Sequence, residues 1–248
     1  MKFSLLSYNI RYGGVGREDH LAAAIRESNA DLVILQEANL PHIVERLANS
    51  TGMTSWAARE GQSVAFLSRI EVSQHHWHQI PRTRRAFLEV VLAGTETRVF
   101  GLHLRALHAN WTERRRVRDL RALLESIKRY QHGFHILTGD FNTLAPGALL
   151  EARQLPLRLR PLLWLSGGKV RWETVQIMLK ADYVDGFRAL HPLDPGFTFP
   201  SWSPHIRLDY VFLPTIFAEC LKSCEVLDDA ESTRRASDHF PLRAVFEG

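Results

Sequence analysis

In the stretch His135–Leu144, written HILTGDFNTL, an apolar run ends abruptly in a glycine and two polar side chains. The fold depends on why a buried strand would end in this way. The aliphatic start of the stretch predicts such a strand. Gly139, Asp140 and Asn142 are also common turn formers, so a plain turn would explain this stretch on its own. In an extended backbone, however, Asp140 and Asn142 project to one side while Phe141 turns to the other. The rest of the chain must show whether other strands end in the same way.

Length and composition favour one enzyme-sized unit. The chain has 248 residues, 45% hydrophobic and 23% charged, so it can bury a large core. We expect a single domain over residues 1–248, since chains of about this length are often one α/β domain. Lys and Arg exceed Asp and Glu by 31 − 27 = 4, and the sequence pI is near 9.3. This balance suits anionic partners such as nucleic acid or phosphate headgroups.

The sequence indicates a cytoplasmic protein. It begins like a signal peptide, but Ser4, Ser7 and Asn9 interrupt the apolar run and no small-residue cleavage site follows. No stretch approaches the ~20 apolar residues of a membrane span. Cys220 and Cys224 are the only cysteines, and no second Cys or His pair stands at zinc-site spacing. We expect both to be reduced and structural.

Short segments rich in β-branched and aromatic residues recur between turn signals and predict strands. They are Phe3–Ile10, Leu32–Gln36, Ser63–Ser68, Ala86–Leu92, Thr97–Leu104, His135–Thr138, Arg207–Leu213 and Phe240–Phe246. Apolar residues at helical spacing predict helices over Glu18–Ser28, Pro41–Ser50 and Thr112–Tyr130, the last with Thr112 as its N-cap.

The connections between these elements predict a mixed sheet. Ala86–Leu92 and Thr97–Leu104 flank a Gly-Thr turn and predict an antiparallel hairpin. The first strand, helix and strand of the chain predict a parallel crossover. The segment Leu144–Lys180 interleaves Leu, Trp and Arg, and we expect a loop and helix insertion near one end of the sheet.

The predicted strands repeatedly end in residues suited to binding a metal or a phosphate. These residues are Asn9, Arg11, Gln36, Glu37, His103, Arg105, Asp140, Asn142, Asp209, Asp238 and His239. Each has a plain structural explanation of its own, such as a helix-initiating acid or a satisfied core histidine. In open α/β sheets, however, functional groups collect at strand ends. The recurrence therefore indicates one site assembled from many strands.

At these positions the chain resembles a known family. The motifs SYNIR, LQEA, the HL of GLHLRA, GDFN, RLDYVF and SDHFPL resemble the successive signatures of the endonuclease/exonuclease/phosphatase superfamily. That group includes deoxyribonuclease I, exonuclease III-like abasic-site endonucleases, neutral sphingomyelinases and inositol polyphosphate 5-phosphatases. The resemblance implies a four-layer α/β sandwich, in which two mixed β-sheets pack face to face with helices outside. It also implies a Mg²⁺ site, which Mn²⁺ could occupy, in a cleft at one end.

The resemblance further implies roles in attack on a phosphoester by an activated water. Glu37 would bind the metal directly, with Asn9 and Asp238 in its immediate shell and several waters completing the coordination. Asn9 would also lie next to the substrate. Asp140 would orient or deprotonate the attacking water, and Asn142 would donate a hydrogen bond to the phosphate and help to place Asp140.

Two histidines complete the implied machinery. His239 would contact a phosphate oxygen as the imidazolium, with Asp209 accepting its other ring proton and raising its pKa. His103 would act as general acid or leaving-group stabiliser, where exonuclease III-like abasic-site endonucleases commonly have a tyrosine. Arg11 and Arg105 each follow a motif residue by two positions and, if the strands continue, are candidate substrate contacts. A solvated arginine is the alternative for both.

The substrate remains open among three classes. Arginines within residues 82–85 and 114–116 could neutralise backbone phosphates of DNA or RNA, although helical arginines also suit a solvated outer face. The stretch PLRLRPLLWLSGGKVRW suits a phospholipid surface, or else a helix that covers a sheet edge. A small-molecule phosphatase would use the same metal site.

We predict a monomeric, metal-dependent phosphodiester hydrolase, and we favour a nuclease over a sphingomyelinase-like enzyme. An inactive binding module is disfavoured because every motif residue is chemically competent.

Overall fold

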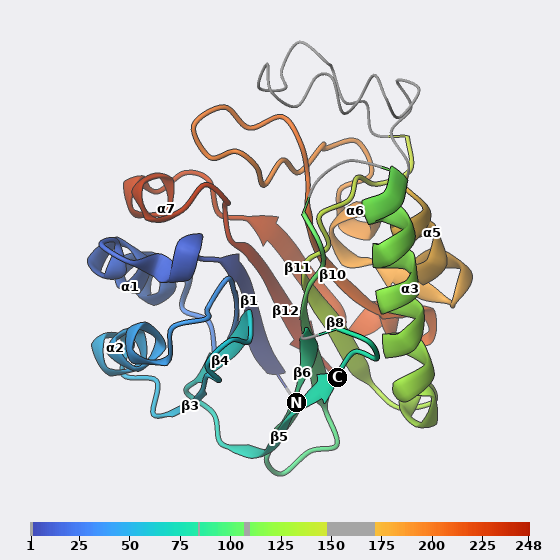
Figure 1. Ribbon diagram of the computed structural model, residues 1–248, viewed down its shortest axis with the longest axis horizontal. Coiled ribbons are helices and arrows are strands. Elements are labelled where there is room, and N and C mark those ends of the chain that lie inside the picture. Colours follow the sequence, from blue (N-terminus) through green and yellow to red (C-terminus); the bar gives the residue numbers. More distant parts are fainter. Residues whose placement is uncertain (1, 84, 107–109, 148–171) are drawn as a thin grey trace.

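Two six-stranded sheets face each other in the computed structural model, which describes residues 2–83, 85–106, 110–147 and 172–248 (Figure 1). Helices cover the outer surfaces of both sheets. The predicted four-layer α/β sandwich with two mixed sheets is therefore confirmed.

The first sheet contains both chain ends of the described part and has the strand order β11-β12-β1-β2-β4-β3. Its strands are β1 (Lys2–Asn9), β2 (Leu32–Gln36), β3 (Ser55–Ala57), β4 (Val64–Ser68), β11 (Leu221–Val226) and β12 (Leu242–Glu247). β1 and β2 pair in parallel, which confirms the predicted crossover, and the other pairs are antiparallel.

The second sheet has the strand order β5-β6-β7-β8-β10-β9. Its strands are β5 (Val72–Gln79), β6 (Ala86–Leu92), β7 (Arg98–His103), β8 (His135–Asp140), β9 (Tyr183–Asp185) and β10 (Asp209–Pro214). β6 and β7 form the predicted antiparallel hairpin, whereas β7 and β8 pair in parallel.

The helices lie in two groups on opposite sides of the sheets (Figure 1). The first sheet is covered by α1 (Glu18–Ser28), α2 (Pro41–Thr51) and α7 (Glu231–Ala236), and the second by α3 (Asn110–Ser126) and α5 (Glu173–Lys180). α6 (Gly186–Leu190) contacts both β10 and β11. Short 3-10 turns form η1 (Tyr12–Gly14), η2 (Lys128–Tyr130) and η4 (Thr215–Cys220). No helix in the described part of the chain has both the length and the apolar character needed to cross a bilayer.

Several predicted boundaries are wrong for identifiable reasons. Thr112 is not an N-cap, because α3 begins at Asn110 and Thr112 is buried inside its first turn. Four strands were not predicted. β3 and β9 are only three residues long, β5 is polar along most of its length, and in β11 only Leu221 and Cys224 are buried, so none of these shows clear apolar alternation. Of the predicted insertion at Leu144–Lys180, residues 148–171 lie outside the described residues, and α5 is its described helix.

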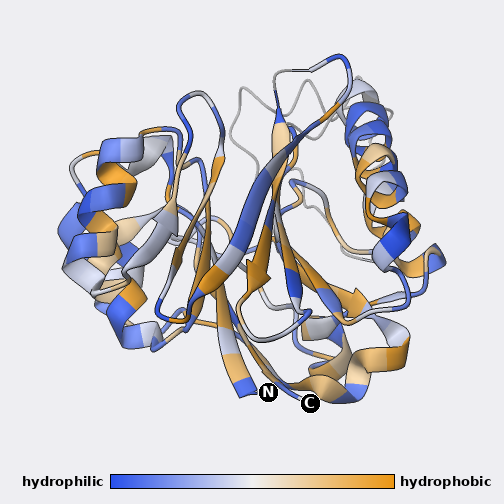
Figure 2. Ribbon diagram, turned by 90° about the horizontal axis from the view of Figure 1, so that it is seen from below, coloured by the Kyte–Doolittle hydropathy of each residue, from blue (hydrophilic) through white to orange (hydrophobic). Residues whose placement is uncertain are grey.

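Strand alternation divides the core into layers (Figure 2). Leu5, Ile34 and Val99 belong to the cluster between the sheets, while Leu6 and Val33 face the helices on the first sheet. The inner face continues along β1 to Asn9, at the end opposite the chain termini (Figure 1). Because alternate residues of a strand face the space between the sheets, the polar residue that ends such a series lies at the seam between the sheets.

Gly139 is required for the parallel pairing of β7 and β8. Its φ is 144°, and a Cβ atom built on it would lie 1.9 Å from the carbonyl oxygen of Leu102. No side chain fits this close approach of two backbones. The glycine that follows the apolar run thus has a packing function in addition to any turn.

We predict that Gly139→Ala lowers the free energy of unfolding by about 2–4 kcal/mol, because backbone strain adds to a steric clash. Urea denaturation measures the loss. Gly94→Ala is the matched control, since Gly94 also has a positive φ of 69° but has no atom within 4 Å of the added Cβ. That variant should lose only about 1 kcal/mol. Equal losses in the two variants would contradict the packing explanation.

Candidate active site

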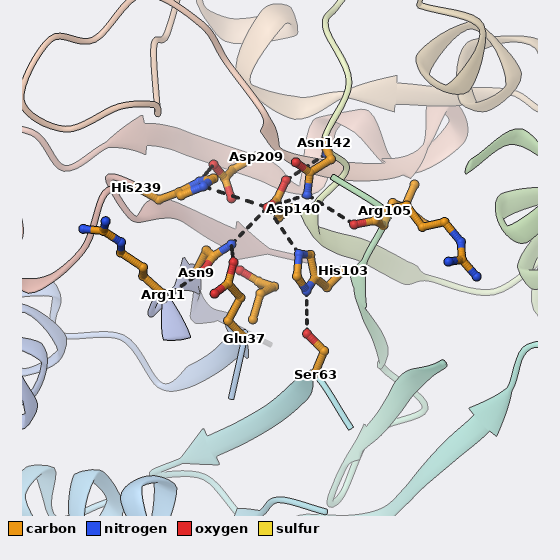
Figure 3. A network of polar contacts seen from close by, with 12 residues as sticks. Asn9, Arg11, Glu37, Ser63, His103, Arg105, Asp140, Asn142, Asp209 and His239 are labelled. Atoms are coloured by element: carbon orange, nitrogen blue, oxygen red, sulfur yellow. Dashed lines mark hydrogen bonds and ion pairs between the residues drawn. The ribbon is translucent and has the colours of Figure 1, made fainter. Parts of the chain in front are cut away.

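Pairing within the second sheet places three predicted site residues in one row. His103 of β7 is the register partner of Asp140 of β8, which is also the register partner of Asp209 of β10. Side chains at one level of neighbouring strands project to the same face of a sheet. The row therefore presents one imidazole and two carboxylates together at the sheet end (Figure 3).

The first sheet supplies residues to the same place. Asn9 is the last residue of β1, Glu37 follows β2 directly, and His239 precedes β12. Nδ2 of Asn9 donates a hydrogen bond to Oδ2 of Asp140 over 3.0 Å and so joins the two sheets. The residues predicted at separate strand ends thus meet at the seam between the sheets.

Asp140 is buried at the centre of this cluster (Figure 3). Its Oδ1 accepts a hydrogen bond from the backbone N–H of Asn142 and its Oδ2 accepts one from Nδ2 of Asn142, each over 2.8 Å. Burial raises the pKa of Asp140 above its ordinary value, and the positive charge of His239 opposes that rise. A carboxyl group tuned in this direction is suited to accepting a proton from water.

The side chains of Asp140 and Asn142 point together as predicted, but not because the strand continues. β8 ends at Asp140, and Asn142 adopts a left-handed backbone with a φ of 51°. Asn tolerates this conformation better than most residues. Phe141 points elsewhere, and its ring packs edge-on against those of Tyr210 and Phe212.

His239 and Asp209 form the predicted pair. Nδ1 of His239 lies 2.9 Å from Oδ2 of Asp209, and Nε2 of His239 lies 3.9 Å from Oδ2 of Asp140. Burial alone would lower the pKa of His239, but the carboxylate of Asp209, followed by that of Asp140, raises it to about 9. The ring is therefore a cation at neutral pH.

His103 is neutral although it belongs to the same cluster. Its Nε2 lies 3.7 Å from Oδ2 of Asp140, and its Nδ1 lies 2.5 Å from Oγ of Ser63. Burial, and then the charges of Arg85 and His239, lower the pKa of His103 to about 3. Of its two predicted roles, hydrogen bonding to a leaving group fits a neutral ring better than proton donation. Ser63 was missed because a serine before a strand carries no sequence signal.

Glu37, the predicted metal ligand, directly follows β2 and lies beside Asn9. Its backbone is left-handed, with a φ of 58°. Its Oε2 accepts the N–H of Tyr12 over 2.6 Å, and its Oε1 accepts Nδ2 of Asn9 over 3.4 Å. Glu37 also lines a pocket of about 310 Å³ together with Arg85 and His103.

The donors fit a magnesium-type ion better than a metal held in a protein cage. Within the described residues, no group of three His, Cys, Asp or Glu side chains is arranged to hold a metal. Mg²⁺ is commonly bound by one or two carboxylates and keeps several of its waters. Glu37 could supply such a carboxylate, and because it is only half-buried it leaves room for water. Asn9 departs from its predicted role as a ligand in this orientation, because its Oδ1 accepts the N–H of Arg11 over 2.9 Å and its NH₂ group faces the carboxylates.

Asp238 and Arg11 pair with each other beside the cluster. Nε of Arg11 lies 3.2 Å from Oδ2 of Asp238. The strand β1 ends before Arg11, whose φ is 51°, so the strand continuation that its prediction assumed is wrong. The ion pair, and not the strand, keeps Arg11 near the site.

Arg105 points in a direction other than the predicted one. β7 ends at His103, and the guanidinium of Arg105 turns away from Asp140 (Figure 3). Its Nε lies 3.5 Å from Oδ2 of Asp119 in α3. Arg85 lies closer to the cluster, because it donates a hydrogen bond from Nη1 to the carbonyl oxygen of His103 over 2.9 Å and lines the pocket.

A buried ion pair behind the site connects α3 with two site loops. Glu113 accepts hydrogen bonds from Nε and Nη2 of Arg116 over 2.9 and 2.7 Å, and from Oγ1 of Thr143 over 3.3 Å. Nη1 of Arg116 donates to the carbonyl oxygen of Arg105 over 2.7 Å. The backbone N–H and hydroxyl of Thr174 in α5 both donate to Glu113 over 2.8 Å. The pair thus fixes the loops after β7 and β8.

The solvated or phosphate-binding face predicted for the helical arginines is wrong at Arg116. Arg114 and Arg115 are exposed, but only 2% of Arg116 is exposed. The position of Arg116, four residues before the buried Leu120, places both on one helix face. That spacing was the available signal.

We predict that Glu113→Gln lowers the free energy of unfolding by about 3–5 kcal/mol, because it removes the buried carboxylate that pairs with Arg116 and accepts the hydrogen bonds of Thr174. Denaturant titration measures this change. Glu125→Gln on the same helix is the matched control, since Glu125 forms an exposed pair with Lys128 at 3.8 Å. The control should lose less than about 1 kcal/mol. Similar losses would show that the buried pair has no special importance.

Comparison with known proteins identifies a family by sequence. The model of the Endonuclease/Exonuclease/phosphatase family matches residues 6–239. No curated protein matches the chain.

Solved structures share the fold. A 3′ phosphatase, NExo, from Neisseria bound to product DNA hairpin has 18% identity and a TM-score of 0.75, with 99% of this chain and 100% of that chain covered. An AP endonuclease from Archaeoglobus fulgidus has 17% identity and a TM-score of 0.74, with coverage of 99% and 100%. D. rerio TDP2 complexed with single strand DNA product has 18% identity and a TM-score of 0.69, with coverage of 100% and 99%. At these identities the likeness establishes the fold alone.

Proposed function

The chain belongs to the endonuclease/exonuclease/phosphatase family, and from this premise we propose that it is a divalent-metal-dependent phosphodiester hydrolase, a nuclease acting on DNA or RNA. The observation that carries the proposal is the buried Asp140 carboxyl, held by Asn9 and Asn142 and faced by the imidazoles of His103 and His239. Phosphoester hydrolysis requires activation of a water, stabilisation of charge on the phosphoryl oxygens and stabilisation of the leaving oxygen, and these groups can supply all three.

Glu37 is the proposed metal ligand, and Asp238 and water are proposed to complete its shell. Asn9 would join that shell only after its amide turns so that Oδ1, which now accepts the N–H of Arg11, faces the ion. When bound, Mg²⁺ or Mn²⁺ would neutralise charge on the phosphoryl oxygens. Because Asp238 is paired with Arg11, its contribution depends on that ion pair.

The remaining residues act on water and on the phosphate. Asp140 accepts the proton of the attacking water, and Asn142 holds the carboxyl in place through two hydrogen bonds. His239 donates a charged hydrogen bond to a phosphate oxygen, with Asp209 keeping its ring protonated. His103 donates a hydrogen bond to the leaving oxygen, while Ser63 fixes its ring.

Nucleic acid is the favoured substrate. Three observations support it: the sequence pI near 9.3, the position of Arg85 beside the pocket, and the DNA bound in two structures of the same fold. The stretch on which the lipid alternative depends falls largely in residues 148–171, outside the described residues. A sphingomyelinase-like lipid phosphodiesterase or a small-molecule phosphatase is the second candidate.

We predict that the protein nicks supercoiled plasmid with Mg²⁺ or Mn²⁺, that EDTA abolishes nicking, and that Asp140→Asn loses about 10²–10⁴-fold in rate because the base is removed. Ile216→Ala is the control and should retain activity. Ile216 is exposed and follows the end of β10 that is opposite the site residue Asp209. Nicking by Asp140→Asn at the parent rate would indicate a contaminant. If no preparation nicks plasmid or cleaves single strands, the nuclease proposal fails, and phospholipids and phosphomonoesters are tested next.

We predict that Asp209 and His239 act as a unit. Asp209→Asn and His239→Ala should each lower kcat more than they change KM, since both affect stabilisation of the reacting phosphate. The double variant should lose little more than His239→Ala alone. Steady-state kinetics of the four proteins measure this coupling. If the loss of kcat in the double variant equals the product of the two single losses, the two residues act independently and the dyad is excluded.

A further inference from the structure

We propose that Tyr12, Arg11 and Trp202 form a stacking surface for an unpaired nucleobase next to the candidate active site, so that the preferred substrate is single-stranded nucleic acid or an unpaired end. This inference rests on the proposed function and specifies its substrate. Neither aromatic residue has a role in the hydrolytic machinery described above.

The two aromatic rings are exposed, and both lie close to one cation. Tyr12 is 74% exposed and Trp202 is 67% exposed. The guanidinium carbon of Arg11 lies 5.2 Å from the ring centre of Tyr12 and 5.9 Å from that of Trp202. These large apolar rings are left in water although aromatic side chains are usually at least half-buried.

Tyr12 is held at the site through its own backbone. Its N–H donates to Oε2 of Glu37, and the N–H of Arg11 donates to Oδ1 of Asn9. Both Arg11 and Tyr12 have left-handed backbones, with φ of 51° and 48°. Nη2 of Arg17 donates to the carbonyl oxygen of Arg11 and supports this turn. A strained turn held in this way fixes the backbone that carries the exposed ring relative to the predicted metal ligand.

Trp202 is held from the other side. The neighbouring Ser201 donates from its backbone N–H to the carbonyl oxygen of Asp238 over 2.8 Å, and from its hydroxyl to that of Ser237 over 2.7 Å. Arg11 in turn contacts Asp238. Two loops far apart in sequence therefore present their aromatic rings around one ion pair at the site.

An unpaired base is the partner that this surface fits best. Aromatic rings and guanidinium planes stack on bases whose faces are free, whereas the bases of a duplex already stack on each other. Trp and Tyr also occur at membrane interfaces. Entry into a bilayer, however, would remove water from the Arg11 guanidinium and the Asp238 carboxylate, whereas a stacked base leaves their edges hydrated.

The test measures binding separately from hydrolysis. In the Asp140→Asn background, a short single strand carrying 2-aminopurine is titrated with protein, because stacking quenches the fluorescence of that base. Tyr12→Ala and Trp202→Ala should each weaken binding about 5- to 150-fold and reduce quenching, as expected for loss of one stacked base. Tyr12→Phe and Trp202→Phe should retain both. Ile216→Ala is the exposed apolar control.

Two further readouts distinguish stacking from charge. The salt dependence of binding should stay unchanged in the alanine variants, because neither substitution removes a phosphate contact. Binding to a blunt duplex of the same sequence should change far less than binding to the single strand. Unchanged single-strand binding and quenching in both alanine variants would overturn the inference.

The inference and the proposed function can fail separately. If the wild-type protein cleaves nucleic acid and the alanine variants cleave and bind single strands equally well, the hydrolase proposal stands and the stacking surface is rejected. If no nucleic acid is cleaved, the proposed function itself fails. Loss of binding to phosphatidylserine vesicles in the alanine variants, with single-strand binding unchanged, would reject the nucleobase and indicate a lipid surface.

Discussion

A carboxyl group buried at the seam between two sheets is the constraint on which the rest of this structure depends. Asp140 is 1% exposed, and a buried carboxylate is unstable unless neighbouring groups donate hydrogen bonds to it. Its donors come from both sheets, Asn9 from the first and Asn142 from the loop after β8. The polar cluster therefore also fixes how the two sheets meet, and the close backbone contact of Gly139 with Leu102 sets the position of the carboxyl.

Two histidines on either side of Asp140 have opposite charge states because their second partners differ. His239 faces Asp209, so its ring is protonated in spite of burial. His103 faces Ser63 and lies near Arg85, so burial leaves it neutral. One cluster therefore offers a cationic and a neutral imidazole at the same pH, a division of roles set by environment and not by residue type.

The arginines show where sequence reasoning reached its limit. Arg116 is buried in an ion pair, Arg105 turns toward α3, and Arg11 lies close to two exposed aromatic rings. The long guanidinium side chain can reach a carboxylate, a carbonyl or a ring from nearly any position in the chain. Its partner is decided by which strands and loops become neighbours, and strand spacing alone does not contain that information.

The sequence by itself determined the strands that alternate clearly, the hairpin of β6 and β7, the parallel pairing of β1 and β2, and the polar residues at strand ends, since these follow from local periodicity and turn chemistry. The tertiary structure alone decided the hydrogen bond of Ser63 to His103, the direction of Arg105 and the orientation of Asn9. The strands β3, β5, β9 and β11, which lack clear apolar alternation, also needed it. The physical reason is that such contacts join segments far apart in the chain, so their energy depends on burial and charge that exist only after both sheets have packed.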